Sequence, residues 1–182
     1  MGTSAALPGF GSPAVGFEQP FEMLVACHER VNRTLDLLRR LLDHVNANGH
    51  DKQSRAAAAD VLRYFDIAAP LHHEDEEFHI FPVLVSRQDA RLRDAITGLQ
   101  RDHEIMATGW MALRGTLVQW RDDKKPPPLD AVMRRRVDDF TGMYGRHIHT
   151  EESMIYPAAR ACFDAVGLAR IGAEMQSRRT AA

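Results

Sequence analysis

The sequence predicts an all-α protein, an up-down-up-down antiparallel four-helix bundle preceded by a flexible N-terminal arm. Three observations support this prediction. Apolar residues recur at steps of three, four and seven over long segments, which is the spacing of one helix face. No segment shows the strict apolar and polar alternation of a β-strand. The connections between the helical segments are short, which favours neighbours that run antiparallel.

The overall composition is that of a single soluble globular domain. The 182 residues are 45% hydrophobic and 26% charged, and a chain of this length buries a core without cross-links. The formal net charge is −2, and the densest basic run is only Arg134–Arg136. A nucleic-acid-binding surface needs a dominant stripe of lysine and arginine, so the sequence argues against nucleic acid as a partner.

The cysteines and the hydropathy pattern bear on the location of the protein. Cys27 and Cys162 match no zinc, redox or disulfide-framework spacing, which favours a reducing compartment. The N-terminal segment lacks the basic and apolar regions of a signal peptide, and no uninterrupted apolar run approaches about 20 residues. We therefore expect a cytoplasmic protein that does not enter a membrane.

The first two helices follow a segment rich in glycine and proline. Residues 1–20 are expected to form the flexible arm. The first helical stripe follows this arm and ends near Gly49, which is suited to the position after a last helical turn. A second helix begins near Asp51 and is expected to bend at Pro70 before it reaches the stretch HHEDEEFHIFP at residues 72–82.

The third and fourth helices are bounded by clear signals. The segment 86–89 resembles a helix cap and begins the third helix. Residues 122–128, DDKKPPP, form a linker, after which the fourth helix runs from about 129 to 163. We expect the bundle to span residues 21–165 and a C-terminal tail with a weaker helical signal to span residues 166–182.

An internal repeat at an offset of 75 residues relates the two halves of the bundle. The apolar stripe of the first helix maps onto that of the third. Each half reads His, then a second His 44 residues later, then Glu four residues on, then Pro six residues after that Glu. Since the chain has nine histidines in all, two register-matched pairs are not expected by chance. The matched ionisable residues include His28 with His103, His72 with His147, Glu76 with Glu151, and Glu77 with Glu152.

The repeat predicts a metal site in the core of the bundle. Residues four apart on a helix have Cβ atoms about 5–6 Å apart, so each His-x-x-x-Glu pair of the repeat points at a common centre. The other two histidines lie on the apolar stripes that face the interior. An unpaired buried carboxylate costs several kcal/mol, and no lysine or arginine falls on these faces near either glutamate. Bound metal ions would neutralise these buried carboxylates. The expected ligands are His28, His72, Glu76, His103, His147 and Glu151.

The repeat also separates the ligands from their ionisable neighbours. His73 with Glu77 is a second pair four residues apart, but its counterpart has Ile148 in place of the histidine. His79 lies on the face of His72 and is a candidate to support a ligand, and Tyr144 either donates a hydrogen bond into the site or packs in the core. One step along an α-helix rotates a side chain by about 100 degrees, which places on the solvated or helix-contacting side His73, Glu74, Asp75, Glu77, His149 and Glu152.

With these residues in this order, the sequence resembles the hemerythrin-like, or HHE cation-binding, domains. The similarity covers about residues 21–163, and both His-x-x-x-Glu motifs run into an apolar-proline ending, EEFHIFP and EESMIYP. The fold of that family is an up-down four-helix bundle around a di-iron centre. The resemblance implies two iron ions with terminal imidazole ligands from all four helices, bridged by Glu76, Glu151 and an oxo or hydroxo group. The same donor set accepts zinc or manganese.

The sequence departs from the oxygen-carrying hemerythrins at one ligand position. Those proteins carry His-x-x-x-His on the third helix, whereas here Ala107 stands four residues after His103. The resemblance therefore does not favour oxygen transport. A ferritin-like site uses Glu-x-x-His on two helices, which residues 76–79 fit once, but Met154 stands where the second histidine is needed. That alternative is disfavoured.

Two classes of function follow from the motif set. The first is a non-enzymatic di-iron binding protein that senses, buffers or responds to iron, oxygen, nitric oxide or peroxide, with a small diatomic or peroxide ligand at the metals. The second is a di-iron redox enzyme, peroxidase-like or nitric-oxide-handling. No residue dedicated to acid–base turnover stands out in the sequence, so the first class ranks higher. A purely structural bundle with a degenerate site is disfavoured by the intact repeat.

Overall fold

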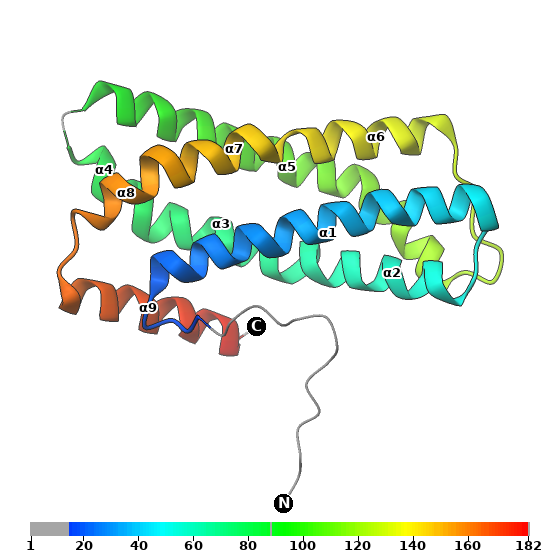
Figure 1. Ribbon diagram of the computed structural model, residues 1–182, viewed down its shortest axis with the longest axis horizontal. Coiled ribbons are helices and arrows are strands. Elements are labelled where there is room, and N and C mark those ends of the chain that lie inside the picture. The colour runs from blue at the N-terminus through cyan, green and yellow to red at the C-terminus, as the bar shows by residue number, and fades with distance from the viewer. Residues whose placement is uncertain (1–14, 88, 182) are drawn as a thin grey trace, which may run out of the picture.

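Four long helices run up, down, up and down, as the sequence predicts (Figure 1). In the computed structural model, residues 15–87 and 89–181 are described, and these residues form helices and no strand. Residues 1–14 of the predicted arm lie outside the described residues. Residues 15–19 lead through a turn into the first helix. None of the helices within the described part of the chain is long and apolar enough to cross a membrane.

The predicted boundaries of the first connection are confirmed. Helix α1 (Pro20–Asn48) begins with proline, whose missing N–H is not needed in a first turn. It ends where Gly49 adopts φ 74° and donates its N–H to the Val45 carbonyl at 2.9 Å. The next helix begins at Asp51, whose carboxylate accepts the N–H of Ser54 at 2.8 Å while the Ser54 hydroxyl accepts the N–H of Asp51 at 2.9 Å.

Two of the four long helices contain π-helical segments, in which the hydrogen bonds run from residue i to residue i+5. The second long helix is made of α2 (Lys52–Arg63), η1 (Tyr64–Ala68), α3 (Ala69–Asp75), η2 (Glu76–Ile80) and α4 (Phe81–Val85). The third is α5 (Ala90–Asp122), capped by the Asp89 carboxylate. The fourth is made of α6 (Ala131–Gly142), α7 (Tyr144–Thr150), η3 (Glu151–Ile155) and α8 (Tyr156–Arg160).

Each π-helical segment is followed by an α-helical segment whose second residue is a proline: Pro70, Pro82 or Pro157. Within a regular α-helix, the proline ring clashes with the carbonyl four residues back and leaves it without a donor. The wider π turn relieves this conflict, and its closing bond runs from the residue before the proline. At Pro70, where we expected a bend, the chain therefore forms η1, closed by the bond from the Ala69 N–H to the Tyr64 carbonyl.

Two apolar clusters fill the bundle, one on each side of a polar layer. Every residue of the two predicted apolar stripes is buried. Leu24 and Leu99 belong to one cluster, and Val31 and Met106 belong to the other. His28 lies between Leu24 and Val31 on α1, and His103 lies between Leu99 and Met106 on α5. The two buried histidines therefore mark the level of the polar layer.

For residues 166–182 we expected a tail, but the described part of this segment, up to residue 181, belongs to a fifth long helix, α9 (Ala165–Ala181). It lies along one end of the bundle beside α1 and α3 (Figure 1). Its apolar stripe is narrow, with Ile171 and Met175 buried four residues apart. Ion pairs add to this attachment, above all those from Arg178 and Arg179 to Asp75. A narrow stripe gives a weak periodic signal, which is why the sequence pattern did not predict this helix.

Candidate metal centre

The six predicted ligands lie together in the polar layer. The two helices with His-x-x-x-Glu motifs each contribute a histidine and, at the first position of η2 or η3, a glutamate. Helices α1 and α5 each contribute one histidine. The exposed fractions are 4% for His28, 7% for His72, 0% for Glu76, 7% for His103, 3% for His147 and 0% for Glu151. The structure thus gathers the residues that the repeat selected, and metal binding by them remains a prediction.

Each of the two carboxylates reaches two imidazole pairs. We call His28 and His72 the first imidazole pair, and His103 and His147 the second imidazole pair. One oxygen of each carboxylate approaches the first pair and the other oxygen approaches the second pair. The four contacts are Glu76 Oε1 to His72 Nε2 at 3.6 Å, Glu76 Oε2 to His103 Nε2 at 3.4 Å, Glu151 Oε2 to His28 Nε2 at 3.2 Å, and Glu151 Oε1 to His147 Nε2 at 2.9 Å.

Carboxylates hold the outward nitrogen of three of these imidazoles. The contacts are His28 Nδ1 to Glu152 at 2.8 Å, His103 Nδ1 to Glu77 at 3.0 Å, and His147 Nδ1 to Asp102 at 3.4 Å. A carboxylate that accepts the Nδ1–H fixes the tautomer and the ring orientation, and it makes the other nitrogen more basic. The Nε2 atoms of these three histidines therefore face the two buried carboxylates.

The expectation that Glu77 and Glu152 lie on the solvated or helix-contacting side missed their function. Each contacts a predicted ligand on another helix, as described above. Both residues follow the first residue of a π-helical segment, where the wider turn separates consecutive side chains by a smaller rotation than an α-helix does. The repeat matched Glu77 with Glu152, and this match was the signal of a shared role.

Tyr156 contacts the residues of the centre, although the sequence pattern indicated it only as part of the apolar-proline ending of the second motif. Its hydroxyl donates to Glu76 Oε1 at 2.5 Å and lies 3.2 Å from His28 Nε2. Its ring stacks on the His28 ring, with centroids 5.6 Å apart and planes 9° apart. The repeat aligns Tyr156 with Phe81, so a hydroxyl present in one half and missing from the other was the available signal.

Assigning His73 to the solvated run was wrong. The side chain is half-buried, and its ring stacks on the His103 ring with centroids 3.9 Å apart and planes 11° apart. The ring of His147 lies 6.2 Å away. Potential ligand atoms of His73, His103 and His147 all lie within 4.8 Å of one another. Burial, together with the neighbouring imidazoles of His103 and His147, holds the pKa of His73 well below its usual range, so this imidazole is neutral.

The remaining ionisable residues of HHEDEEFHIFP contact α9. Asp75 is fully buried, against the expectation of a solvated side chain, because α9 covers it. Its carboxylate accepts from Arg178 at 2.5 Å and from Arg179 at 2.6 Å. His79 pairs with Glu174 of α9, so it does not support a ligand. Of the residues expected on the solvated side, His149 is exposed as predicted.

The two buried carboxyls of Glu76 and Glu151 differ in protonation. Burial, together with the charge of Glu151, raises the pKa of Glu76 to about 7. Burial alone would also raise the pKa of Glu151, but the imidazoles of His103, His147 and His28 outweigh it and hold that pKa well below its usual range. Burial would lower the pKa of His103, but Glu151 and Glu76 raise it to about 10. Without metal, His103 is therefore protonated near neutral pH and Glu76 is partly protonated. Burial would lower the pKa of His28, but its contacts with Glu151, Glu76 and Glu152 raise that pKa as well.

Several buried polar atoms of the layer have no hydrogen-bond partner among the described residues. They are His72 Nδ1, His103 Nε2, Glu76 Oε2 and both carboxylate oxygens of Glu151. A buried polar atom left unpaired costs about 1–3 kcal/mol, so this concentration of them calls for a further ligand. Imidazole nitrogens and carboxylate oxygens are donors that suit first-row metal ions. The donor set therefore fits a pair of cations bridged by two carboxylates.

A cavity of about 10 Å³ adjoins the centre, which is the space that one water molecule needs. Both imidazole pairs contribute to its wall, through His28, His72 and His147. Tyr144 is buried and packs in the apolar core against Phe65 and Phe140, as one of the two expectations had it, and it also lines this cavity. The other lining residues are His73, Val31, Tyr64, Ala69 and Ile148.

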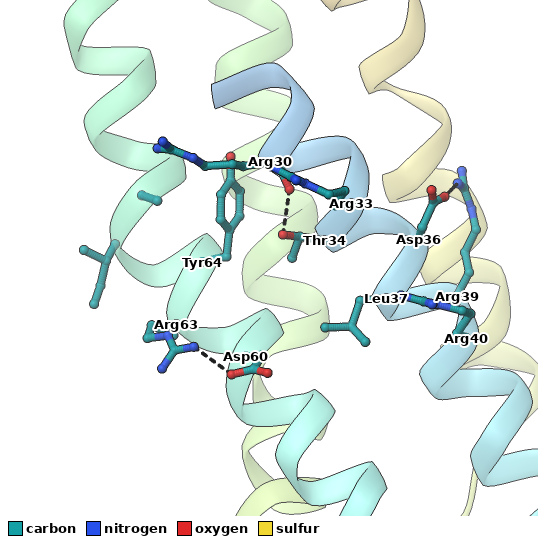
Figure 2. Close-up of a pocket in the computed structure, with 12 residues that line it drawn as sticks. Arg30, Arg33, Thr34, Asp36, Leu37, Arg39, Arg40, Asp60, Arg63 and Tyr64 are labelled. Carbon is teal, nitrogen blue, oxygen red and sulfur yellow. Dashed lines mark hydrogen bonds and ion pairs between the residues drawn. The ribbon is translucent and has the colours of Figure 1, made fainter. Parts of the chain in front are cut away.

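A larger groove of about 940 Å³ lies between α1 and the α2–η1 segment (Figure 2). Figure 2 shows Tyr64 and Arg30 toward one end of the groove, with Arg39 and Arg40 toward the other. Five arginines against two aspartates line it, so the groove carries positive charge: Arg30, Arg33, Arg39, Arg40 and Arg63, with Asp36 and Asp60. Tyr64 is the residue that the linings of this groove and of the small cavity have in common.

The fold and the polar layer together define a helical bundle with a candidate cation site, and one of two comparisons with known proteins gives the family. The sequence profile of the hemerythrin HHE cation binding domain matches residues 19–159. An uncharacterized protein of Haemophilus influenzae (strain ATCC 51907 / DSM 11121 / KW20 / Rd) is 32% identical over 163 residues, which is 90% of this chain and 91% of that relative. The chain belongs to the hemerythrin HHE cation-binding family.

Proposed function

We propose that this protein is a cytoplasmic non-haem di-iron protein that senses, buffers or responds to a small ligand such as oxygen, nitric oxide or peroxide. The observation that carries the proposal is the pair of buried carboxylates, each reaching both imidazole pairs. When bound, the two ions supply Lewis acidity and electron exchange to the small ligand. The two cysteines, Cys27 and Cys162, are both free thiols, which is compatible with a reducing compartment.

The protein groups prepare the site before any ion binds. Glu152, Glu77 and Asp102 each hold one imidazole in place, which limits the freedom that the ligands lose when a metal ion enters. Apolar clusters above and below the layer exclude water from it. Glu76 and His103 carry the protons that the ions displace, so metal uptake releases protons to solvent.

The small cavity beside the centre limits the size of the exogenous ligand. Its volume of about 10 Å³ favours a ligand of only a few atoms over an organic substrate. Val31, Ala69 and Ile148 give it an apolar wall, and Tyr64 and Tyr144 add phenol rings. This combination supports a diatomic or peroxide ligand rather than a metabolite.

The arginine-lined groove supplies the route to that cavity. Its positive charge raises the local concentration of small anions such as azide, whereas oxygen, nitric oxide and hydrogen peroxide are uncharged and are not attracted by it. Only the ring of Tyr64 is shared between the linings of the groove and the cavity, so we assign it the role of a gate. The Tyr64 hydroxyl donates to the Cys27 carbonyl at 3.3 Å, which holds the ring in the closed position.

The proposal is tested on protein reconstituted with ferrous iron and then exposed to oxygen. We expect two iron ions per chain and the absorption bands of an oxo-bridged diferric centre. Azide added to this form should shift those bands, because it occupies the exogenous position. Failure to retain iron after both aerobic and anaerobic reconstitution, with an unchanged melting temperature, would contradict the proposal.

One observation favours the redox enzyme as a second candidate function. The Tyr156 hydroxyl is a proton donor within the centre, where the sequence had indicated none. Burial, together with the charges of Glu76 and Glu151, raises the pKa of Tyr156 well above its usual range, so the hydroxyl keeps its proton. Peroxide turnover well above that of free iron, and its loss in Tyr156→Phe with iron content retained, would establish this candidate.

A further inference from the structure

We infer that His73 is a fifth imidazole ligand of the centre and that it serves the metal ion held by the second imidazole pair. The inference rests on the proposed function, because it concerns the same pair of ions. The observation that carries it is the placement of His73 from α3 against His103 from α5 and His147 from α7.

The nitrogens of the three rings lie close to the separation that one shared ion needs. Ligand nitrogens at about 2.1 Å from an ion lie at most about 4.2 Å from each other. The potential ligand atoms of His73, His103 and His147 lie within 4.8 Å of one another. The rings of His73 and His103 are stacked, with centroids 3.9 Å apart and planes 11° apart. Because an imidazole lone pair lies in the plane of its ring, the His73 ring must turn about its side-chain bonds to direct a nitrogen at the ion of the second imidazole pair.

His73 has no competing polar partner. Among the residues that the structure describes, neither ring nitrogen of His73 takes part in a hydrogen bond. Its ring contacts are with other histidines, at 3.9 Å to His103, 6.0 Å to His72 and 6.2 Å to His147. A neutral imidazole placed among imidazoles gains little from packing alone, whereas a cation between them pairs with all their lone pairs.

His73 makes the two ions unequal. The position that matches it in the other half of the repeat is Ile148, which has no donor atom. The ion of the first imidazole pair is therefore left with two imidazoles and two carboxylates, whereas the ion of the second pair gains a third imidazole. The oxygen-carrying hemerythrins have a histidine on the third helix where this chain has Ala107, and here His73 supplies the third imidazole from a different helix. The first ion keeps more positions for an exogenous ligand.

A cobalt titration separates a ligand from a packing residue. Co²⁺ is added to the metal-free wild-type protein and to the variants His73→Ala, His73→Gln and His149→Ala. The absorption of Co²⁺ reports the number and geometry of its ligands, and equilibrium dialysis gives the stoichiometry. His149 is an exposed histidine on the α7 segment, so its replacement serves as the matched control.

The ligand role predicts a specific loss. Wild type and His149→Ala should bind two Co²⁺ ions with the same affinities. In both His73 variants one of the two ions should bind at least about tenfold more weakly, with a changed visible spectrum, while the other ion is unaffected. Unchanged binding and spectra in folded His73 variants would overturn the inference and leave the proposed function intact. Wild-type protein that binds no ion would overturn both.

A second measurement needs no variant and therefore does not depend on whether the variants fold. Zn²⁺ binds the same imidazole and carboxylate donors and is suited to NMR. In zinc-loaded wild-type protein with ¹⁵N-labelled histidine, the nitrogen shifts should show five coordinated imidazoles, including His73. Four coordinated imidazoles, with His73 unaffected by zinc, would overturn the inference.

Discussion

The attachment of α9 to Asp75 gives the sharpest stability prediction, through the double substitution Arg178→Ala with Arg179→Ala. Asp75 is 0% exposed, and the two guanidinium groups approach it at 2.5 and 2.6 Å. Burial raises the pKa of Asp75, and the two arginines only partly offset that effect. The ion pair as a whole therefore adds little to the stability of the folded state. Removing both arginines, however, leaves the buried Asp75 carboxylate without a partner, and that is strongly destabilising.

Removing the partners of a buried charge costs about 3–5 kcal/mol. For a chain of this size that corresponds to a melting temperature lowered by roughly 10 °C. The contacts of Arg178 with Glu74 and Glu174 add little to this figure, because those carboxylates are 46% and 41% exposed. Adding Asp75→Asn to the double variant should restore at least half of the loss, because an amide does not leave a charge behind.

Thermal and urea unfolding followed by circular dichroism measure these effects. Asp60→Ala is the control, since Asp60 pairs with Arg63 in a contact where both side chains are about half exposed, and it should change stability by less than about 0.5 kcal/mol. Since the folded pKa of Asp75 is raised, its stabilising contribution is full at low pH and is lost as pH rises. The deficit of the double variant should therefore be smaller at pH 5 than at pH 8. A triple variant no more stable than the double variant would refute the reasoning.

Three further predictions concern the centre. Glu77→Gln should weaken metal binding about 10–100-fold, because it removes the carboxylate that orients His103, whereas the control Glu104→Gln on the exposed face should leave the affinity unchanged. Equal metal affinities in the two variants would contradict the orienting role of Glu77. Metal affinity should rise with pH, because ions must displace the protons on Glu76, with a pKa of about 7, and on His103, with a pKa of about 10. Calorimetry in buffers of different ionisation enthalpy should therefore show proton release at pH 6, and an affinity that does not change between pH 6 and pH 8 would be inconsistent with these pKa values. Tyr64→Ala should speed azide binding to the iron-loaded protein at least about tenfold in stopped-flow absorption, whereas Tyr64→Phe keeps the ring and should bind slowly; equal rates in both would remove the gate.

The sequence predicted the fold and the six residues of the polar layer because both depend on regular periods. Helical spacing defined the stripes on α1 and α5, and the 75-residue repeat separated the ligand histidines from the rest. Gly49 and Asp51 marked helix boundaries through local backbone chemistry, which does not depend on tertiary contacts. Features of this kind are visible in a single chain.

The features that were missed depend on contacts between distant segments or on a departure from regular α geometry. Glu77 reaches His103 because η2 is a π-helical turn, and the constant 100-degree rotation of an α-helix did not allow for it. Asp75 looked like a solvated residue because its partners lie about a hundred positions further along the chain, on α9. Tyr156 and His73 occupy positions where the two halves of the repeat differ, so a search for similarity passed over them.

The central claim is that two cations lie between the two imidazole pairs, bridged by the two buried glutamates. A crystal of the iron-loaded protein, measured at the iron absorption edge, tests it most directly. We predict two anomalous peaks per chain in the polar layer, one beside His28 and His72 and the other beside His103 and His147. A layer without anomalous signal in protein that carries iron elsewhere would contradict the account.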